Sequence, residues 1–410
     1  MEEVALAART LFAHGAYAEA APLFAQLAQA RPDQAAAQYH WGVVLAKLED
    51  FEAALGRFRC AIALDPNFAA AYTNIGVCLN ALNRVPLARQ AFALARHIAP
   101  EDPVPVLNEG IAALTMGDYD SGWRDFAARW RLPAYARFQR SFPQPPWQGE
   151  PLQGKRIFLY AEQGFGDTIQ MIRFAPGLMA RGASVCVEVQ PALTDLIARN
   201  LKGATIISQG APVPAFDFHC ALMDVPRALT ISLENLPAPE RYLAADPARG
   251  ERFKRGTMAQ KRIGLCWTGR VQHENNANRS LSLTNLAPLW CYTEVEWISL
   301  QRLVPDADRA ALTASPLQDW GSDFMDFSAT AAAIEALDLV ITVDTAIAHL
   351  AGALGKEVWI LLPFAGDWRW LMNRTDSPWY PTARLFRQEK RGTWDSVIQA
   401  VAEVLRLNNV

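Results

Sequence analysis

The stretch 161-AEQGFGDTIQ-170 follows the apolar run 157-IFLY-160 and precedes 171-MIRFAPGLMA-180, which has the apolar spacing of a buried helix. Two glycines, an aspartate and a threonine therefore stand where a strand is expected to turn into a helix. Such junctions bind anions, because the first N–H groups of a helix are unpaired and its dipole is positive there. The pattern is neither G-x-G-x-x-G nor a phosphate-binding loop with its lysine. The negative charge of Asp167 at this place needs an explanation.

Strand-like and helix-like segments alternate on both sides of this stretch. This alternation predicts two parallel sheets covered by helices, in two Rossmann-like halves. Ligands of such folds bind at the carboxyl ends of the strands, where 161–170 and 344-DTAIAH-349 are both expected to lie. The predicted strands are 156–160, 184–189, 204–208, 262–267, 295–300, 338–343 and 357–362, and the main helices lie near 167–181, 191–201, 328–337 and 345–354.

The first third of the chain repeats itself every 34 residues. Within the unit 35–68, apolar residues recur at helical spacing on both sides of 48-LED-50, which predicts two antiparallel helices. Gly42 and Ala54 would let these helices approach closely, and Phe58 would fill the gap between them. The residues that keep the period are Pro32, Pro66 and Pro100; Ala20, Ala54 and Ala88; Phe24, Phe58, Phe92 and Phe126; and Gly42, Gly76 and Gly110.

This pattern resembles the tetratricopeptide repeat, with three repeats over residues 1–102 and a degenerate fourth at 103–134, where Gly122 replaces the small alanine. The concave face of such a stack usually docks a protein or peptide. The alternative is that the repeats cap or dimerise the following domain, so that formation of a homo-oligomer is left open.

Composition is that of an ordinary globular protein, with 51% hydrophobic and 20% charged residues among 410. A net charge of −3 gives no general attraction to nucleic acid or to an anionic membrane. The acidic, helical N-terminus does not indicate a signal peptide, and no apolar run reaches membrane-spanning length. The six cysteines are dispersed in apolar runs or predicted helices, so we expect reduced core thiols. A cytoplasmic protein is expected.

The segments 161-AEQGFGDTIQMIRFAPGL-178 and 343-VDTAIAHLAGALGKEVWILLPF-364 resemble bacterial glycosyltransferases of family 9, the heptosyltransferase-like kind. The whole chain is similar to bacterial proteins that place tetratricopeptide repeats ahead of such a domain, and more distantly to protein O-GlcNAc transferases. The resemblance implies an α plus α/β chain, with an all-α repeat superhelix followed by a GT-B-like pair of Rossmann-type domains.

The patterns and the resemblance together divide the chain into six segments. They are the repeats (1–134), a connector across the surface (135–152), an acceptor-side Rossmann-like half (153–245), a hinge (246–260), a donor-side Rossmann-like half (261–388) and a C-terminal helix that crosses back to the first half (389–410).

On the acceptor side, the resemblance makes Asp167 the catalytic base that takes a proton from the acceptor. The alternative is an N-cap for a helix that begins near Thr168, and one residue can do both. The residues expected to form the rest of this acceptor-side loop are Gln163, Gly164, Gly166 and Thr168.

On the donor side, Thr345 and the helix that opens after Asp344 are expected to hold a diphosphate. His349, one turn later, would donate to the same diphosphate and assist its departure, although a lone histidine is more often structural. The family pattern has glycine where this chain has Ala346, and that methyl narrows the approach of backbone to phosphate.

Three further donor-side features come from the second half. Arg279 occupies a position similar to the basic residue that family 9 enzymes aim at the donor phosphates, in a polar loop that contains His273. Gln301, after a predicted strand, is assigned to the nucleobase or ribose. The aromatic cluster 368-WRW-370 with 379-WY-380 either stacks on sugar or forms a packing layer.

No metal or other cofactor is expected beyond the nucleotide sugar. The two Asp-x-Asp pairs, 118-DYD-120 and 306-DAD-308, follow no strand in the position that metal-dependent transferases use, so both are interpreted as structural. The leading hypothesis is a metal-independent, inverting glycosyltransferase whose acceptor, a protein or otherwise a saccharide, is recruited by the repeats. The alternatives are a non-catalytic scaffold with a degenerate transferase domain and a nucleotide-binding regulator, which would have no use for Asp167.

Overall fold

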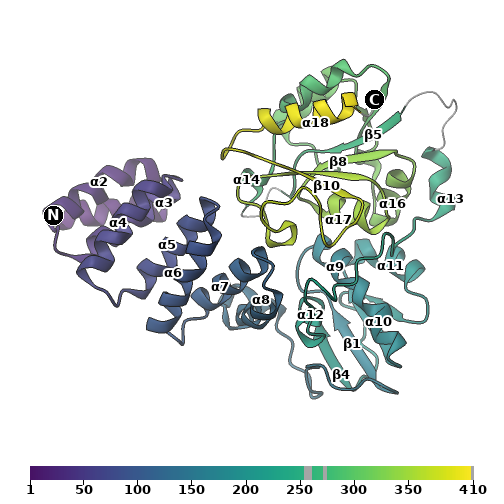
Figure 1. Cartoon of the computed structure of the whole chain (residues 1–410), viewed down its shortest axis with the longest axis horizontal. Coiled ribbons are helices and arrows are strands. Elements are labelled where there is room, and N and C mark those ends of the chain that lie inside the picture. The colour runs from purple at the N-terminus through teal and green to yellow at the C-terminus, as the bar shows by residue number, and fades with distance from the viewer. Residues whose placement is uncertain (254–260, 271–274, 408–410) are drawn as a thin grey trace. The chain divides into compact units, whose positions relative to one another are not determined.

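The computed structural model describes residues 1–253, 261–270 and 275–407 and divides into two units, Met1–Gln139 and Arg140–Val410 (Figure 1). The boundary lies inside the predicted connector 135–152. His273, the second part of the predicted hinge and the last three residues lie outside the described ranges. The described part of that hinge is helical, with α13 (Pro247–Gly250) followed by a short 3-10 turn.

Unit 1 consists of consecutive antiparallel helix pairs with the predicted period. The first helices of neighbouring repeats contact one another, α3 with α5 and α5 with α7, so they line one side of the stack. The helices are α1 (Glu2–Ala13), α2 (Tyr17–Ala30), α3 (Ala35–Lys47), α4 (Phe51–Leu64), α5 (Ala69–Ala81), α6 (Val85–Ile98), α7 (Pro103–Thr115) and α8 (Tyr119–Phe126).

Within one repeat, the helices approach as the small residues predicted. A Cβ built on Gly42 of α3 would lie 2.6 Å from Cε1 of Phe58 in α4, and Phe58 is completely buried. The aromatic ring therefore occupies the space that any side chain at position 42 would need. The predicted role of this pair is confirmed.

Gly42→Ala is expected to destabilise unit 1 by up to about 2 kcal/mol. The methyl group gains about 1 kcal/mol in helix propensity, but overpacking against a fixed ring costs about 1–3 kcal/mol. Gly56→Ala is the matched control, because Gly56 lies in α4 with nothing within 4 Å of a built Cβ, so this variant should be slightly stabilised. Urea unfolding followed by circular dichroism measures both. Equal shifts in the two variants would contradict the packing argument.

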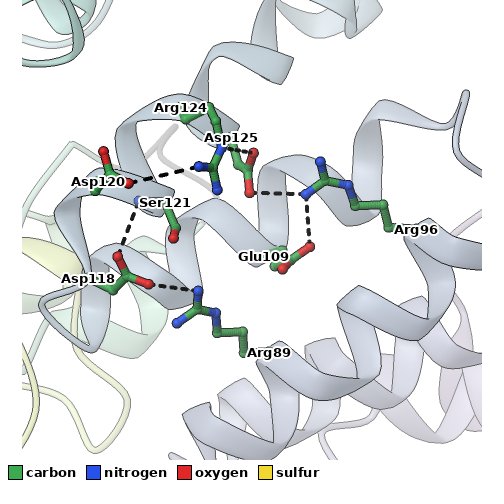
Figure 2. A network of polar contacts seen from close by, with 8 residues as sticks. All are labelled: Arg89, Arg96, Glu109, Asp118, Asp120, Ser121, Arg124 and Asp125. Carbon is green, nitrogen blue, oxygen red and sulfur yellow. Dashed lines mark hydrogen bonds and ion pairs between the residues drawn. The ribbon is translucent and has the colours of Figure 1, made fainter.

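The fourth helix pair is fixed to the third repeat by a network of ion pairs (Figure 2). Arg96 of α6 donates to Asp125 of α8 at 3.1 Å and to Glu109 of α7 at 3.3 Å, and Asp125 is only 5% exposed. Arg89 donates to Asp118 at 2.7 Å. Because α6 thus binds both helices of the degenerate repeat, residues 103–126 continue the stack.

Unit 2 contains two parallel sheets. The first has the strand order β3-β2-β1-β4, and the second has the order β10-β9-β8-β5-β6-β7. The strands of the first are β1 (Arg156–Tyr160), β2 (Ser184–Val189), β3 (Thr205–Ser208) and β4 (Phe218–Ala221); those of the second are β5 (Lys261–Cys266), β6 (Val295–Ser299), β7 (Gln318–Asp319), β8 (Leu339–Val343), β9 (Val358–Leu362) and β10 (Ala383–Arg387).

Each sheet reverses its strand order at one place. In the first sheet the chain moves outward through β1, β2 and β3 and then returns to the other side of β1. In the second it moves through β5, β6 and β7 and then returns beside β5 as β8. Such switch points open a crevice at the carboxyl ends of the strands, where ligands of open α/β sheets bind. The loops after β1 and β8 both begin there.

Helices from the two halves of unit 2 pack on each other, α9 on α17 and α11 on α16 (Figure 1). The C-terminal helix was expected to cross back to the first half, which is wrong: its apolar face joins the core of the second half. The helices are α9 (Phe165–Met171), α10 (Ala175–Ala180), α11 (Thr194–Asn200), α12 (Val225–Ala228), α13 (Pro247–Gly250), α14 (Asn276–Arg279), α15 (Arg309–Ala314), α16 (Phe327–Glu335), α17 (Ala346–Ala353) and α18 (Asp395–Leu407).

Two further expectations need correction. The connector does not only cross the surface, because Trp147 is buried and its backbone N–H donates at 2.8 Å to the carbonyl of His219 in β4. Cys60 and Cys291 are exposed, unlike the other four cysteines, because Cys60 faces outward on α4 and Cys291 ends a 3-10 segment. In the part of the chain that the structure describes, no helix is long and apolar enough to cross a membrane.

Candidate functional site

Asp167 lies in the first turn of α9, directly after the loop that follows β1. The helix begins at Phe165, so the N-cap alternative is wrong in detail. Instead, Oδ2 of Asp167 reaches back and accepts the N–H of Gly164 at 2.8 Å. The carboxylate therefore stabilises the start of the helix and is at the same time held at the carboxyl end of β1.

The other carboxylate oxygen of Asp167 accepts from Arg369, which belongs to the second half of unit 2. The Arg369 guanidinium also donates to Gln170 at 2.8 Å and to Asp367 at 2.8 Å. Its side chain is 9% exposed and that of Asp167 is 19% exposed. Burial alone would lower the pKa of Arg369, but the charges of Asp367 and Asp167 outweigh it and raise that pKa. One cation thus joins the two halves.

The turn after β8 has the form that its sequence predicts. Thr345 is the N-cap of α17, and its hydroxyl accepts the N–H of Ile347 at 3.2 Å. Burial and the neighbouring charge of Asp367 raise the pKa of Asp344 to about 6, against the opposing charges of Arg279 and Arg369. The start of α17, where the helix dipole is positive, and a weakly acidic carboxyl group therefore lie side by side.

His349 is buried at the contact between α17 and α9. Its Nδ1 is 2.8 Å from the hydroxyl of Tyr380, and its ring stacks on Trp370 with centroids 5.5 Å apart. A Cβ built on Gly166 would lie 2.6 Å from Cδ2 of His349. Burial, together with the charge of Arg369, lowers the pKa of His349, so the imidazole is neutral near pH 7 and can contribute a hydrogen bond but no charge.

Arg279 ends α14 and approaches the same place from the loop after β5. Its charge acts on both Asp344 and His349, and its guanidinium lies against Gly269. Its Nε is buried, with no acceptor among the described residues. The structure therefore brings Asp167, Asp344 and His349 together with two arginines.

Gln301 is occupied inside the fold. Its Oε1 accepts the N–H groups of Trp267 at 3.3 Å and Thr268 at 3.2 Å, and its Nε2 donates to the carbonyl of Leu303 at 3.1 Å. The side chain thus shapes the loop after β5. A contact with a nucleobase or ribose stays a prediction.

The remaining loop residues are tied to β2 through one glutamine. The hydroxyl of Thr168 donates to Gln190 at 2.9 Å, and Gln190 donates to the carbonyl of Gln163 at 2.9 Å. The side-chain amide nitrogens of Gln163 and Gln170 are buried and find no acceptor among the described residues. Together with Arg279, they form a set of buried donors around Asp167 and Asp344, which suits a ligand rich in acceptor oxygens.

Sequence reasoning missed Arg369 and Arg173 as residues that join the halves. Arg173 donates to the carbonyl of Trp379 at 2.7 Å and to the hydroxyl of Tyr242 at 3.0 Å, while its guanidinium lies 4.7 Å from the ring centroid of Tyr380. The predicted aromatic cluster 368–370 with 379–380 is buried, as the packing-layer alternative expects. In the sequence, the arginine between two tryptophans in 368-WRW-370 was the feature that could have indicated the role of Arg369.

The two Asp-x-Asp pairs have structural partners. Asp118 accepts the N–H of Ser121 at the start of α8, and Asp308 accepts from the indole of Trp267 at 2.8 Å. Among the described residues, no group of three or more His, Cys, Asp or Glu side chains is placed to hold a metal ion.

Comparison with known proteins identifies the first unit. Residues 6–55 and 39–103 match the tetratricopeptide repeat family model, which confirms the repeats. The protein FlbA of Caulobacter vibrioides is 27% identical over 413 residues, which cover 92% of this chain and 68% of that protein. This similarity extends over both units.

Two solved structures resemble the repeats. MamA from Desulfovibrio magneticus RS-1 (residues 41 to the end) is 24% identical and covers 34% of this chain and 77% of its own, with a TM-score of 0.31. The second repeat domain of human RPAP3, in complex with an HSP70 peptide, is 19% identical and covers 27% of this chain and 91% of its own, with a TM-score of 0.26.

Proposed function

We propose that unit 2 is a glycosyltransferase of the GT-B type, which moves a sugar from a nucleotide-sugar donor to an acceptor. The observation that carries the proposal is the meeting of Asp167 from one half with Asp344, His349 and Arg369 from the other, where both sheets reverse their strand order. Two segments about 180 residues apart, to which the sequence assigns complementary roles, lie against each other, and the carboxyl ends of strands at such switch points are where ligands of open α/β sheets bind.

The donor diphosphate would bind at the turn after β8. The positive dipole end of α17 and the charge of Arg279 suit a phosphate, and neutral His349 can donate one hydrogen bond to it. Stabilising the negative leaving group in this way assists cleavage of its bond to the sugar. No metal ion takes part in this proposal.

Asp167 would remove the proton of the acceptor hydroxyl as that oxygen attacks the sugar from the face opposite the diphosphate, which inverts the configuration. Both carboxylate oxygens already accept one hydrogen bond, but each has a second lone pair for the acceptor. The acceptor is proposed to be a protein or peptide that the repeats recruit on the side lined by α3, α5 and α7.

A second candidate is a repeat scaffold whose transferase domain no longer reacts. Two observations favour it. The carboxylate of Asp167, which would have to act as the base, is already engaged in an ion pair with Arg369, and Ala346 stands in the position of the family glycine. The two candidates differ in whether a nucleotide binds at the turn after β8.

Thermal stabilisation by UDP, GDP, ADP, CMP and their common sugar conjugates tests the proposal. A ligand that binds only the folded state raises the melting temperature according to its affinity and concentration. One nucleotide is expected to stabilise the wild type but not His349→Gln or Arg279→Gln. The control His97→Gln, which changes an exposed histidine of unit 1, should respond like the wild type. Absence of any shift at millimolar nucleotide favours the scaffold.

A further inference from the structure

Arg369 interacts with carboxylates from both halves of unit 2. In this structure it bonds Asp167 of one half and Asp367 of its own half, and its charge also acts on Asp344. Two of these carboxylates belong to the donor side and one to the acceptor side. The arginine therefore stands between the two parts of the proposed reaction centre.

A side-chain amide with an N–H group left unbonded by the described residues, that of Gln170, lies beside this cation. The Oε1 of Gln170 accepts from Nε of Arg369 at 2.8 Å, while Nε2 of the same amide is fully buried and has no acceptor among the described residues. A buried donor of this kind costs stability unless a partner arrives. The amide N–H of Gln170 and the guanidinium of Arg369 are therefore two neighbouring donors, a pair that suits an anionic oxygen.

We infer that Arg369 is a shared cation for which Asp167 and a bound phosphate group compete. A phosphate at the turn after β8 would draw the guanidinium to itself, and Asp167 would lose its ion pair at the moment when a base is needed. Arg369 is thus a positioning residue that couples anion binding to the exposure of Asp167. The inference rests on the proposed function only in requiring that an anion binds at this turn.

Inorganic pyrophosphate is a suitable probe, because its binding does not depend on the sugar, the base or the acceptor. Its dissociation constant can be measured by calorimetry at constant ionic strength on the full chain. Asp167→Asn removes the competitor, so pyrophosphate should bind about fivefold or more tightly to this variant than to the wild type, the lower limit of ordinary site-to-site coupling. Arg369→Gln should bind it more weakly than the wild type.

Removing the negative charge of Asp167 can strengthen anion binding through the electric field even without a shared cation. The double variant Asp167→Asn with Arg369→Gln separates these two causes. When Arg369 is already glutamine, Asp167→Asn should give no further gain, because no shared cation is left. Asp306→Asn, which neutralises a 94% exposed carboxylate of the same unit, should bind like the wild type. If Arg369→Gln does not fold, Arg369→Lys serves, with a smaller gain expected since lysine cannot bridge several partners.

Three results would overturn the inference. They are an unchanged or weaker affinity in Asp167→Asn, the same gain from this change with and without Arg369, and no binding of pyrophosphate to the wild type. The proposed function fails separately. If the coupling is measured but no nucleotide sugar supports transfer to any acceptor, the shared cation stands and the transferase does not.

Discussion

Asp167→Asn is expected to reduce sugar transfer by at least about 100-fold, because a general base in the transition state typically contributes a factor of 10² to 10⁴. The asparagine side chain can still accept the N–H of Gly164 through its oxygen, so α9 should remain intact. Nucleotide binding should not be weakened in this variant, since Asp167 lies on the acceptor side of the turn that is proposed to hold the donor. Release of the nucleoside diphosphate measures the rate.

The control for this change is Asp306→Asn, whose carboxylate is exposed and pairs with Arg309 three residues on. This variant should transfer sugar at the wild-type rate. Transfer that survives in Asp167→Asn would show that another group accepts the proton, and the assignment of Asp167 as base would be wrong.

Arg173→Gln is expected to lower the free energy of unfolding of unit 2 by about 2–6 kcal/mol, because each buried acceptor left without its donor costs about 1–3 kcal/mol and two carbonyls are affected. The arginine is 5% exposed, and its loss leaves the carbonyls of Gln170 and Trp379 without their donor. Those two carbonyls belong to different halves, so the variant also loosens the contact between α9 and the segment around Trp379.

Arg181→Gln is the matched control, because Arg181 lies eight residues further along the same half and is exposed. A surface change of this kind should stay within about 0.5 kcal/mol of the wild type. Thermal unfolding monitored by tryptophan fluorescence compares the two variants. Equal melting temperatures would show that the bonds of Arg173 contribute little to holding the halves together.

The strands that sequence predicts well are those buried on both faces. β1 and β2 were predicted at their observed bounds and β8 within one residue, because such strands are continuous apolar runs. β4 (218-FHCA-221) and β10 (383-ARLFR-387) were missed, since a histidine and two arginines interrupt their apolar pattern. The predicted helix 167–181 is divided into α9, a 3-10 turn and α10, with Pro176 in the first turn of α10.

The candidate site was predictable only where its residues form a local pattern. Gly166-Asp167 follows a strand directly and Thr345 opens a helix, so both could be placed from neighbouring residues. Arg369 could not be placed, because its partner Asp167 lies 202 residues away. Gln301 shows the opposite problem. Its position after a strand suggested a contact with a ligand, but its side-chain amide accepts hydrogen bonds from the loop after β5.

A crystal structure of the full chain with the nucleotide that stabilises it best would test the central claim most directly. The claim predicts that the diphosphate lies at the turn after β8, against Thr345 and between Arg279 and Arg369, with Asp167 on the opposite side. A nucleotide bound elsewhere on the chain, or none at saturating concentration, would contradict the account.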